Sequence, residues 1–189
     1  MSVRQLPSRR TPLRIRRATI RDLDVLVLHR HRMFSDLDHW DQIDPPALAA
    51  VGRAYRPWLR ERMRSGRLVA FLAEDPDRIP PLGSGCVWLR EGPPRPRWTR
   101  GTFPYIMNMY TVPEARGRGV ATRILKEALR WCRTQGFPRV VLNASDMGRP
   151  VYARVGFEPG SEMRFEFVPL HPAGGEAKKR GRPFRRRCD

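Results

Sequence analysis

The 189-residue chain predicts a mixed α/β (α+β) fold, in which a central, mostly antiparallel sheet is flanked by helices. Three observations lead to this prediction. Short apolar or alternating runs, typical of strands, are interspersed with segments that have the 3.6-residue period of amphipathic helices. Proline- and glycine-rich connections of hairpin length join several of the runs. The length suits one domain rather than two. The predicted order of elements is β-α-α-β-β-β-α-β-α-β.

A strand and two helices are predicted first. Residues 13–16 alternate apolar residues with arginines, as in a half-buried strand. Thr19 and Asp22 have the spacing of a capping box, and apolar residues at helical spacing follow them. Pro46 suits the first turn of a second helix, which Pro57 is expected to end or kink.

Hairpin strands are predicted in the middle of the chain. The segment EDPDRIPPLGSG connects a strand over residues 68–73 to a returning strand over 86–89. After the proline-rich segment EGPPRPRWTRGT, a longer strand is expected over 103–112, with side chains alternating between two faces. One face would carry Phe103, Tyr105, Met107 and Met109, and the other Ile106, Asn108 and Tyr110.

The most regular helical pattern in the sequence begins near Val120 and is closed by Gly136. Residues 139–142 are then expected to form a short buried strand, and residues 150–154 a short helix. An alternating run at 163–167 predicts the final strand.

Basic residues are concentrated near the two ends of the chain. Of the net charge of +18, residues 1–17 contribute +6 and residues 176–189 contribute +5. We therefore predict a flexible basic arm over residues 1–12, one domain over residues 13–170, and a flexible basic tail over residues 171–189.

Several function classes are excluded by composition. The longest apolar run has six residues, against roughly 20 for a membrane-spanning helix, and no signal-peptide pattern is present. Three widely spaced cysteines predict free thiols. His29, His31 and His39 are expected at the surface, without a third fixed ligand for a metal. We expect a soluble, cytoplasmic protein with no metal and no membrane association.

The segment TVPEARGRGVATRIL connects the strand at 103–112 to the long helix. The first N–H groups of a helix are unpaired and lie at the positive end of its dipole, so they suit a phosphate or pyrophosphate. Gly117 and Gly119 allow close approach of the backbone, and Arg116 and Arg118 add charge. The P-loop pattern is absent, and the predicted hairpins do not form the βαβ unit of a dinucleotide site.

Arg116, Gly119 and Ala121 fit a third phosphate-binding pattern, Arg/Gln-x-x-Gly-x-Gly/Ala. With its flanks, MNMYTVPEARGRGVATRIL, the loop resembles motif A of the Gcn5-related N-acetyltransferases, the GNAT superfamily. About 35 residues later, PVYARVGF resembles the second signature of that family. The resemblance covers roughly residues 13–168 and implies the GNAT fold and acetyl-CoA-dependent N-acetyltransferase activity.

The resemblance implies that acetyl-CoA is a co-substrate bound largely by main-chain groups. The pantetheine arm would be bound by Met109, Tyr110, Thr111 and Val112. The pyrophosphate would be bound by Arg116, Gly117, Arg118, Gly119, Val120 and Ala121. Ser145 stands where many family members have an asparagine that contacts the cofactor.

Tyr152 occupies the position of the family's general acid, which protonates the departing thiolate of CoA. Its alternative role is to pack beside Phe157. Several relatives have a glutamate as general base on the preceding strand, where this chain has Asn108, which could orient a water molecule or the acceptor amine. Other candidates for the base stay open: Glu91, Asp146 and Glu166.

The segment MFSDLDHWDQIDPP, between the first two predicted helices, is acidic in an otherwise basic chain. In the family this region shapes the acceptor pocket. We expect the primary amine of a small cationic acceptor to be bound there by Phe34, Asp36, Asp38 and Trp40. A solvated loop whose aspartates cap helices is the alternative.

The tail segment KKRGRPFRRR resembles the core of an AT-hook, which enters the minor groove of DNA. It supports an alternative function, a nucleic-acid- or ribosome-associated protein acetyltransferase or binding protein. The oligomeric state stays open, with a homodimer among the alternatives.

Overall fold

The structure, a computed structural model, describes residues 13–36, 45–96 and 98–163. Five strands form one sheet in the order β1-β2-β3-β4-β5, with the first three neighbouring pairs antiparallel and β4–β5 parallel. The strands are β1 (Arg14–Arg17), β2 (Leu68–Glu74), β3 (Gly83–Glu91), β4 (Thr102–Thr111) and β5 (Val141–Leu142). The predicted fold class is confirmed.

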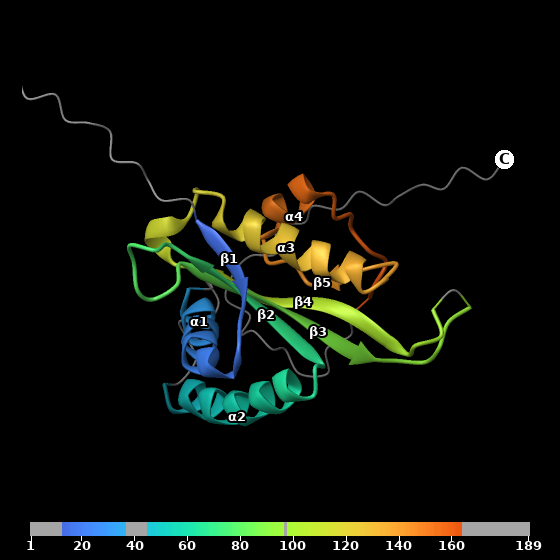
Figure 1. The fold of residues 1–189 in the computed structure, drawn as a ribbon, viewed down its shortest axis with the longest axis horizontal. Helices are drawn as coiled ribbons and strands as arrows, with labels where there is room; N and C mark the ends of the chain where they lie inside the picture. Colours follow the sequence, from blue (N-terminus) through green and yellow to red (C-terminus); the bar gives the residue numbers. More distant parts are fainter. Residues whose placement is uncertain (1–12, 37–44, 97, 164–189) are drawn as a thin grey trace, which may run out of the picture. The chain divides into compact units, whose positions relative to one another are not determined.

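Helices cover both faces of this sheet. Figure 1 shows α1 (Leu23–Ser35) and α2 (Pro45–Arg64) on one face, and α3 (Val120–Thr134) and α4 (Arg149–Val155) on the other. These elements belong to the first of two compact units, residues 1–158, and the described part of the second, residues 159–163, contains no helix or strand. Within the described residues, no helix has the length and apolar character needed to span a membrane.

The capping box at the start of the first helical segment is confirmed. Thr19 Oγ1 accepts a hydrogen bond from the Arg21 amide at 3.3 Å, and the Asp22 carboxylate accepts one from the Thr19 amide at 2.7 Å. Asp22 also forms an ion pair with Arg16 of β1 at 2.7 Å. A 3₁₀ turn, η1 (Ile20–Asp22), therefore leads into α1 with its first donors satisfied.

Helix α2 does not end at Pro57, as one of the two predicted outcomes required, but continues to Arg64. Proline has no N–H, so the carbonyl of Arg53 loses its helical partner. Both residues are exposed, so water can satisfy that carbonyl. Tyr55 and Leu59, on either side of the proline, are buried against the sheet and hold the helix in place.

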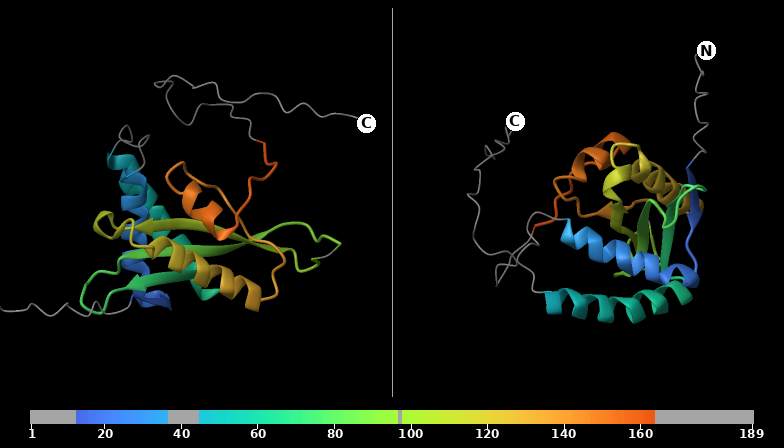
Figure 2. Two further views of the ribbon diagram at one scale, coloured as in Figure 1. Left: turned by 90° about the horizontal axis from the view of Figure 1, so that it is seen from above. Right: turned by 90° about the vertical axis from the view of Figure 1, so that its left-hand side faces the viewer.

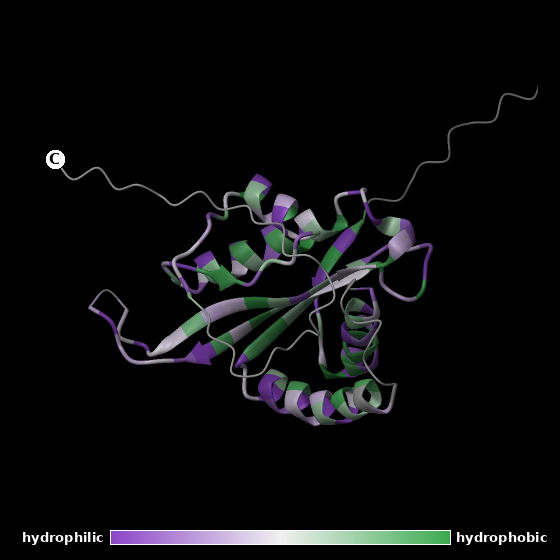
Figure 3. Cartoon of the chain, turned by 180° about the vertical axis from the view of Figure 1, so that it is seen from behind, coloured by the Kyte–Doolittle hydropathy of each residue, from purple (hydrophilic) through white to green (hydrophobic). Residues whose placement is uncertain are grey.

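The core consists of two apolar clusters, one on each face of the sheet. Leu26, Leu59 and Leu72 belong to the cluster beneath α1 and α2, whereas Ile124 and Leu125 anchor α3 in the other. Figure 3 shows apolar residues along the middle strands and polar residues on much of α2. Full burial of one such side chain contributes about 1.5–3 kcal/mol.

Strand β4 contains a bulge that the predicted alternation missed. Its register against β3 shifts so that Asn108 and Met109 together lie opposite Gly85, and Asn108 has a φ of 53°. Met107 packs with the cluster beneath α1 and α2, but Met109 packs with the α3 cluster, so their predicted common face is wrong. One extra residue reverses the faces of a strand beyond it.

The C-terminal strands also differ from the sequence prediction. β5 pairs with β4 through only two residues, Tyr105 and Ile106, and Val141 is 39% exposed, so the expected burial of residues 139–142 is wrong. An edge strand of this length has one open side. Met163 is 93% exposed and lies in no strand, and the rest of the predicted final strand falls outside the described residues.

Candidate functional site

The connection between β4 and α3 begins with a 3₁₀ turn, η2 (Pro113–Ala115). Two amides of the following loop are used by the chain itself. The Arg116 amide donates to the Pro113 carbonyl at 3.1 Å, and the Arg118 amide donates to the Ala115 carbonyl at 3.4 Å. These bonds fix the path of the loop toward the start of α3.

Five neighbouring amides remain unpaired within the described part of the chain: those of Gly117, Gly119, Val120, Ala121 and Thr122, of which the first four belong to the predicted pyrophosphate loop. Gly117 and Gly119 have φ values of 74° and 76°, in the left-handed region that favours glycine. A Cβ atom on either glycine would meet no other atom within 4 Å. Unpaired amides beside open space at a helix N-terminus form an anion-binding concavity.

The Arg116 side chain already interacts with two groups of the chain, which limits its interaction with a bound anion. Its Nε donates to the Thr111 carbonyl at 3.2 Å, and its Nη2 forms an ion pair with Asp36 at the C-terminal end of α1. The sequence assigned these two residues to different ligands, the cofactor and the acceptor. The structure brings them together, whereas Arg118 has no acidic partner among the described residues.

Among the described residues, the edge of β4 that faces β5 has no strand partner beyond Ile106, because β5 ends after two paired residues. Met109, at the bulge, has no strand partner in the described structure, whereas Tyr110 lies opposite Ser84 of β3. The Val112 amide is already bound, since it donates to the Leu82 carbonyl at 3.0 Å. The buried Thr111 Oγ1 has no hydrogen-bond partner in the described structure. An extended ligand with amide groups can therefore lie along this edge.

The bulge directs Asn108 into a buried polar network beneath α1 and α2. Asn108 is 9% exposed; its Oδ1 accepts a hydrogen bond from Arg30 Nη1 at 2.5 Å, and its Nδ2 donates to the Tyr55 hydroxyl at 2.6 Å. Burial raises the pKa of Tyr55 far above its usual value, so this hydroxyl stays neutral. The sequence did not connect these residues, although an arginine on the apolar face of a helix was the signal.

Tyr152 lies on α4 with its ring 6.0 Å from the Phe157 ring in an edge-to-face contact. Its packing role is therefore real. Its hydroxyl has no hydrogen-bond partner among the described residues, and burial raises its pKa, with nearby Tyr105 adding to the shift. A raised pKa keeps the phenol protonated, as a proton donor must be.

Ser145 stabilises the turn that begins α4. Its Oγ accepts a hydrogen bond from the Gly148 amide at 3.2 Å, and its carbonyl accepts one from the Arg149 amide at 2.9 Å. The hydroxyl hydrogen is not used by these bonds. The predicted cofactor contact of Ser145 remains a prediction.

The carboxylates considered as general bases are engaged elsewhere or not described. Glu91 pairs with Arg67, and its position opposite Thr102 puts it at the far end of β4 from the loop. Asp146 lies 3.7 Å from Arg149 and is almost fully exposed. Glu166 lies outside the described residues.

The structure describes two of the four predicted acceptor residues, Phe34 and Asp36. The Phe34 ring is already stacked by the Arg30 guanidinium, 4.6 Å from its centroid, and Asp36 is paired with Arg116. Asp38 and Trp40 lie outside the described residues. A cation therefore already occupies one face of Phe34.

His29 was expected at the surface, and this prediction is wrong. The residue is fully buried where α1 crosses β3 and β4, with Nδ1 2.9 Å from Ser84 Oγ and the ring 5.1 Å from that of Tyr110. Burial lowers the pKa of His29 to about 4, so the imidazole is neutral at pH 7. His31 is exposed as expected, and His39 lies outside the described residues.

Comparison with known proteins identifies the family of the chain. The model of the acetyltransferase (GNAT) family matches residues 29–157. A GCN5-related N-acetyltransferase from Ralstonia eutropha JMP134 is 30% identical, with a TM-score of 0.71 over 82% of this chain and 98% of its own. A predicted acetyltransferase from Clostridium acetobutylicum, crystallised with acetyl-CoA, is 26% identical, with a TM-score of 0.71 over 82% of this chain and 96% of its own.

A more distant structure shares the fold alone. Glucosamine-6-phosphate N-acetyltransferase from Arabidopsis thaliana is 17% identical, with a TM-score of 0.61 over 84% of this chain and all of its own. No curated protein sequence matches the chain. The family match covers more than half of the chain and includes the loop, the bulged strand and α4, so the chain belongs to the GNAT family of N-acetyltransferases.

Proposed function

We propose that the protein transfers an acetyl group from acetyl-CoA to the primary amine of a small cationic molecule. The observation that carries the proposal is the set of unpaired amides at Gly117, Gly119, Val120 and Ala121, at the start of α3. Such amides bind a diphosphate without side-chain specificity. The open edge of β4 nearby suits the pantetheine arm.

The proposed reaction is a direct attack of the amine on the thioester carbonyl. Main-chain N–H groups at the end of β4 polarise this carbonyl, the new C–N bond forms, and the C–S bond breaks. The acceptor amine loses one proton to water before it attacks. Tyr152 gives its proton to the departing thiolate, and the second proton, released by the nitrogen when the C–N bond forms, returns through water to Tyr152. Asn108 acts as a positioning residue, because its amide is held by Arg30 and by the buried Tyr55.

An acceptor screen that measures free thiol release tests this function. We expect acetyl-CoA turnover with one or more amines, and a kcat lower by about 10²- to 10⁴-fold for Tyr152→Phe. The affinity of this variant for acetyl-CoA, measured by calorimetry, should be unchanged. A variant with full kcat would remove Tyr152 as the acid, and wild-type protein that binds no acetyl-CoA would contradict the function itself.

We propose that the acidic segment after α1 receives the acceptor amine, with Asp38 and Trp40 as its principal ligands and Phe34 and Asp36 at its border. The variants Asp36→Asn and Asp38→Asn should each raise the acceptor KM. Asp38→Asn should leave the affinity for acetyl-CoA unchanged. Unchanged acceptor KM values at all of these positions would remove the acidic segment from the acceptor site.

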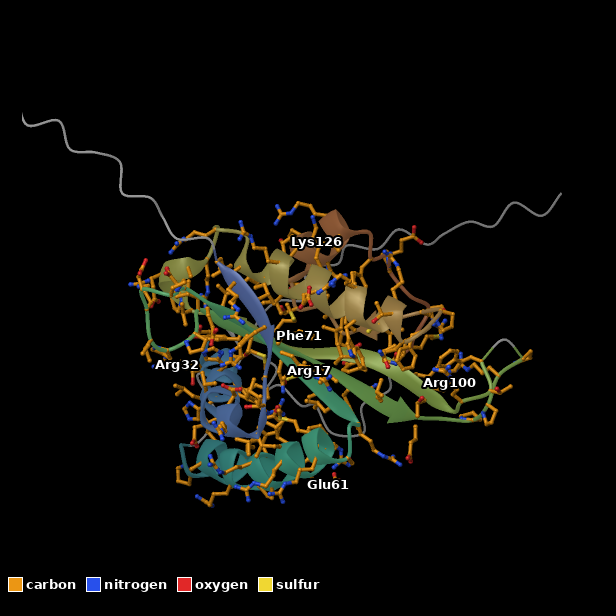
Figure 4. All side chains as sticks on the ribbon, in the orientation of Figure 1. Arg17, Arg32, Glu61, Phe71, Arg100 and Lys126 are labelled. Carbon is orange, nitrogen blue, oxygen red and sulfur yellow. The ribbon has the colours of Figure 1, made fainter. Side chains whose placement is uncertain are left out.

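The alternative, a nucleic-acid-associated acetyltransferase, is supported by the β3–β4 connection. Figure 2 shows this connection projecting beyond the helices, and Figure 4 marks Arg100 on it. Arg95 and Arg100 stack on Phe103 and Trp98, each at 5.0 Å, an arrangement that suits polyanions. Salt-dependent binding of RNA or DNA that disappears on truncation at Gly175 would assign binding to the tail, whereas loss on substitution of these arginines would assign it to the connection.

A further inference from the structure

Arg30 of α1 is a partly buried cation that has no acidic partner among the described residues. Its guanidinium lies between the rings of Phe34 and Tyr55, 4.6 and 4.5 Å from their centroids. The acidic residues elsewhere on η1 and α1 are already paired: Asp22 with Arg16, Asp24 with Arg56, and Asp36 with Arg116. Nothing in the described structure neutralises the charge of Arg30.

The hydrogen-bonding capacity of Arg30 is also largely unused. Of five N–H donors, the structure pairs one, on Nη1, with the Asn108 side chain. The Nε atom is out of contact with water and has no acceptor. The donors that stay available to a ligand are the two on Nη2 and the second one on Nη1, and a pair of Nη donors can bind the two oxygens of a carboxylate. Stacking on two rings orients these donors, and the buried Nε stays unsatisfied.

The position of Arg30 relates this charge to the proposed acceptor site. Arg30 lines a small cleft between α1 and α2, about 10 Å³ in volume, together with Val27, His31, Phe34, Leu48, Val51, Gly52 and Tyr55. The cleft has room for a water-sized group. Through Asn108, Arg30 is linked directly to the bulge of β4, where the acceptor amine would meet the thioester.

We propose that Arg30 binds a carboxylate of the acceptor, so that the substrate class is small amino carboxylates, such as free amino acids. This inference rests on the proposed function and narrows it: the reacting amine supplies the positive charge, and a second group of the same molecule supplies a negative one. The carboxylate accepts hydrogen bonds from the Nη donors that Asn108 does not use, and Asn108 keeps the guanidinium in place. A structural cation that binds no ligand is the competing explanation.

A matched pair of acceptor sets separates these explanations. The wild-type protein, Arg30→Met, Arg30→Lys and the control Arg32→Met are assayed with L-amino acids and with the corresponding carboxamides. Arg32 is an exposed arginine on the same helix. We expect kcat/KM of the wild type and of Arg32→Met to be about 10- to 100-fold higher for the acids than for the carboxamides. The preference should be lost in Arg30→Met and reduced in Arg30→Lys. Equal use of acids and carboxamides by the wild type, or a preference that survives in Arg30→Met, would overturn the proposal.

A second measurement needs no turnover and no knowledge of the substrate. The arginine Nε–H resonances of ¹⁵N-labelled protein are followed while acetate, and separately inorganic phosphate, is added. We expect acetate to shift one resonance that is missing in Arg30→Met and present in Arg32→Met. No such shift, or a shift with phosphate only, would overturn the proposal. Acetyl-CoA binding measured on the same samples reports on the proposed function independently, because the diphosphate loop does not include Arg30.

Discussion

At the scale of single residues, the ion pair between Arg116 and Asp36 connects the proposed cofactor loop with the end of α1. Both side chains are partly exposed, so the pair itself adds at most about 1 kcal/mol to stability. Its larger effect is on charge: Asp36 cancels the positive charge that the sequence assigned to the pyrophosphate. The pair therefore sets how strongly Arg116 can assist the amides.

We predict that Asp36→Asn binds acetyl-CoA about two- to five-fold more tightly than the wild type, because Arg116 is released toward the pyrophosphate. Calorimetry at low salt measures this change. Asp24→Asn, which releases Arg56 instead, is the matched control and should leave the affinity unaltered. If Asp36→Asn instead raises the acceptor KM and leaves the affinity for acetyl-CoA unchanged, Asp36 is an acceptor ligand and not a counter-ion.

His29 predicts a pH dependence of stability. Its pKa is about 4 in the folded protein and 6.5 when unperturbed, so below pH 6.5 the unfolded chain binds a proton that the folded protein does not accept until about pH 4. Stability should therefore be highest above pH 6.5 and fall between 6.5 and 4, by about 3 kcal/mol from this group. Urea unfolding at several pH values should show a flatter profile for His29→Gln than for the wild type. The exposed His31→Gln should behave like the wild type, and identical profiles for all three would contradict the assignment.

At the scale of elements, β3 and α3 approach each other closely at Gly85. A Cβ atom there would lie 2.8 Å from Ile124 Cγ2 and would also overlap Met109 Sδ. Gly52 of α2 is the opposite case, because a Cβ atom would meet nothing within 4 Å. The two glycines form a matched pair for substitution.

We predict that Gly85→Ala lowers the free energy of unfolding by about 1–3 kcal/mol, because α3 or Met109 must move away from the sheet. Gly52→Ala should raise it by up to about 1 kcal/mol, since alanine favours a helix. Thermal or urea unfolding of both variants measures the difference. Equal changes of the same sign would show that α3 does not pack on β3 as described.

Much of the element order could be predicted, because it depends on local patterns. Periodicity identified α3, and the spacing of Thr19 and Asp22 identified the start of the first helical segment. The bulge could not be predicted, because a single extra residue in β4 leaves no trace in an alternating sequence; only the pairing with β3 reveals it. The burial of His29 was also missed, since it depends on the crossing of α1 over two strands.

At the scale of the whole molecule, the sequence predicted the enzyme family but not the contacts of the proposed acceptor site. Two short segments with fixed spacing identified the family because a helix start that binds a diphosphate needs glycines at particular positions. The proposed binding of the acceptor carboxylate depends on contacts between α1, α2 and β4, which are far apart in sequence. Arg30, Tyr55 and Asn108 meet only in the folded protein, and their network was therefore not foreseen.

The central claim is that the unpaired amides before and at the start of α3 bind the diphosphate of acetyl-CoA. Titration of ¹⁵N-labelled protein with acetyl-CoA, followed by amide NMR, tests it most directly. We predict large downfield shifts for the amides of Gly117, Gly119, Val120 and Ala121, and smaller shifts for those of Arg116 and Arg118, which already donate within the chain. Saturating acetyl-CoA that leaves the four amides unshifted would contradict the claim.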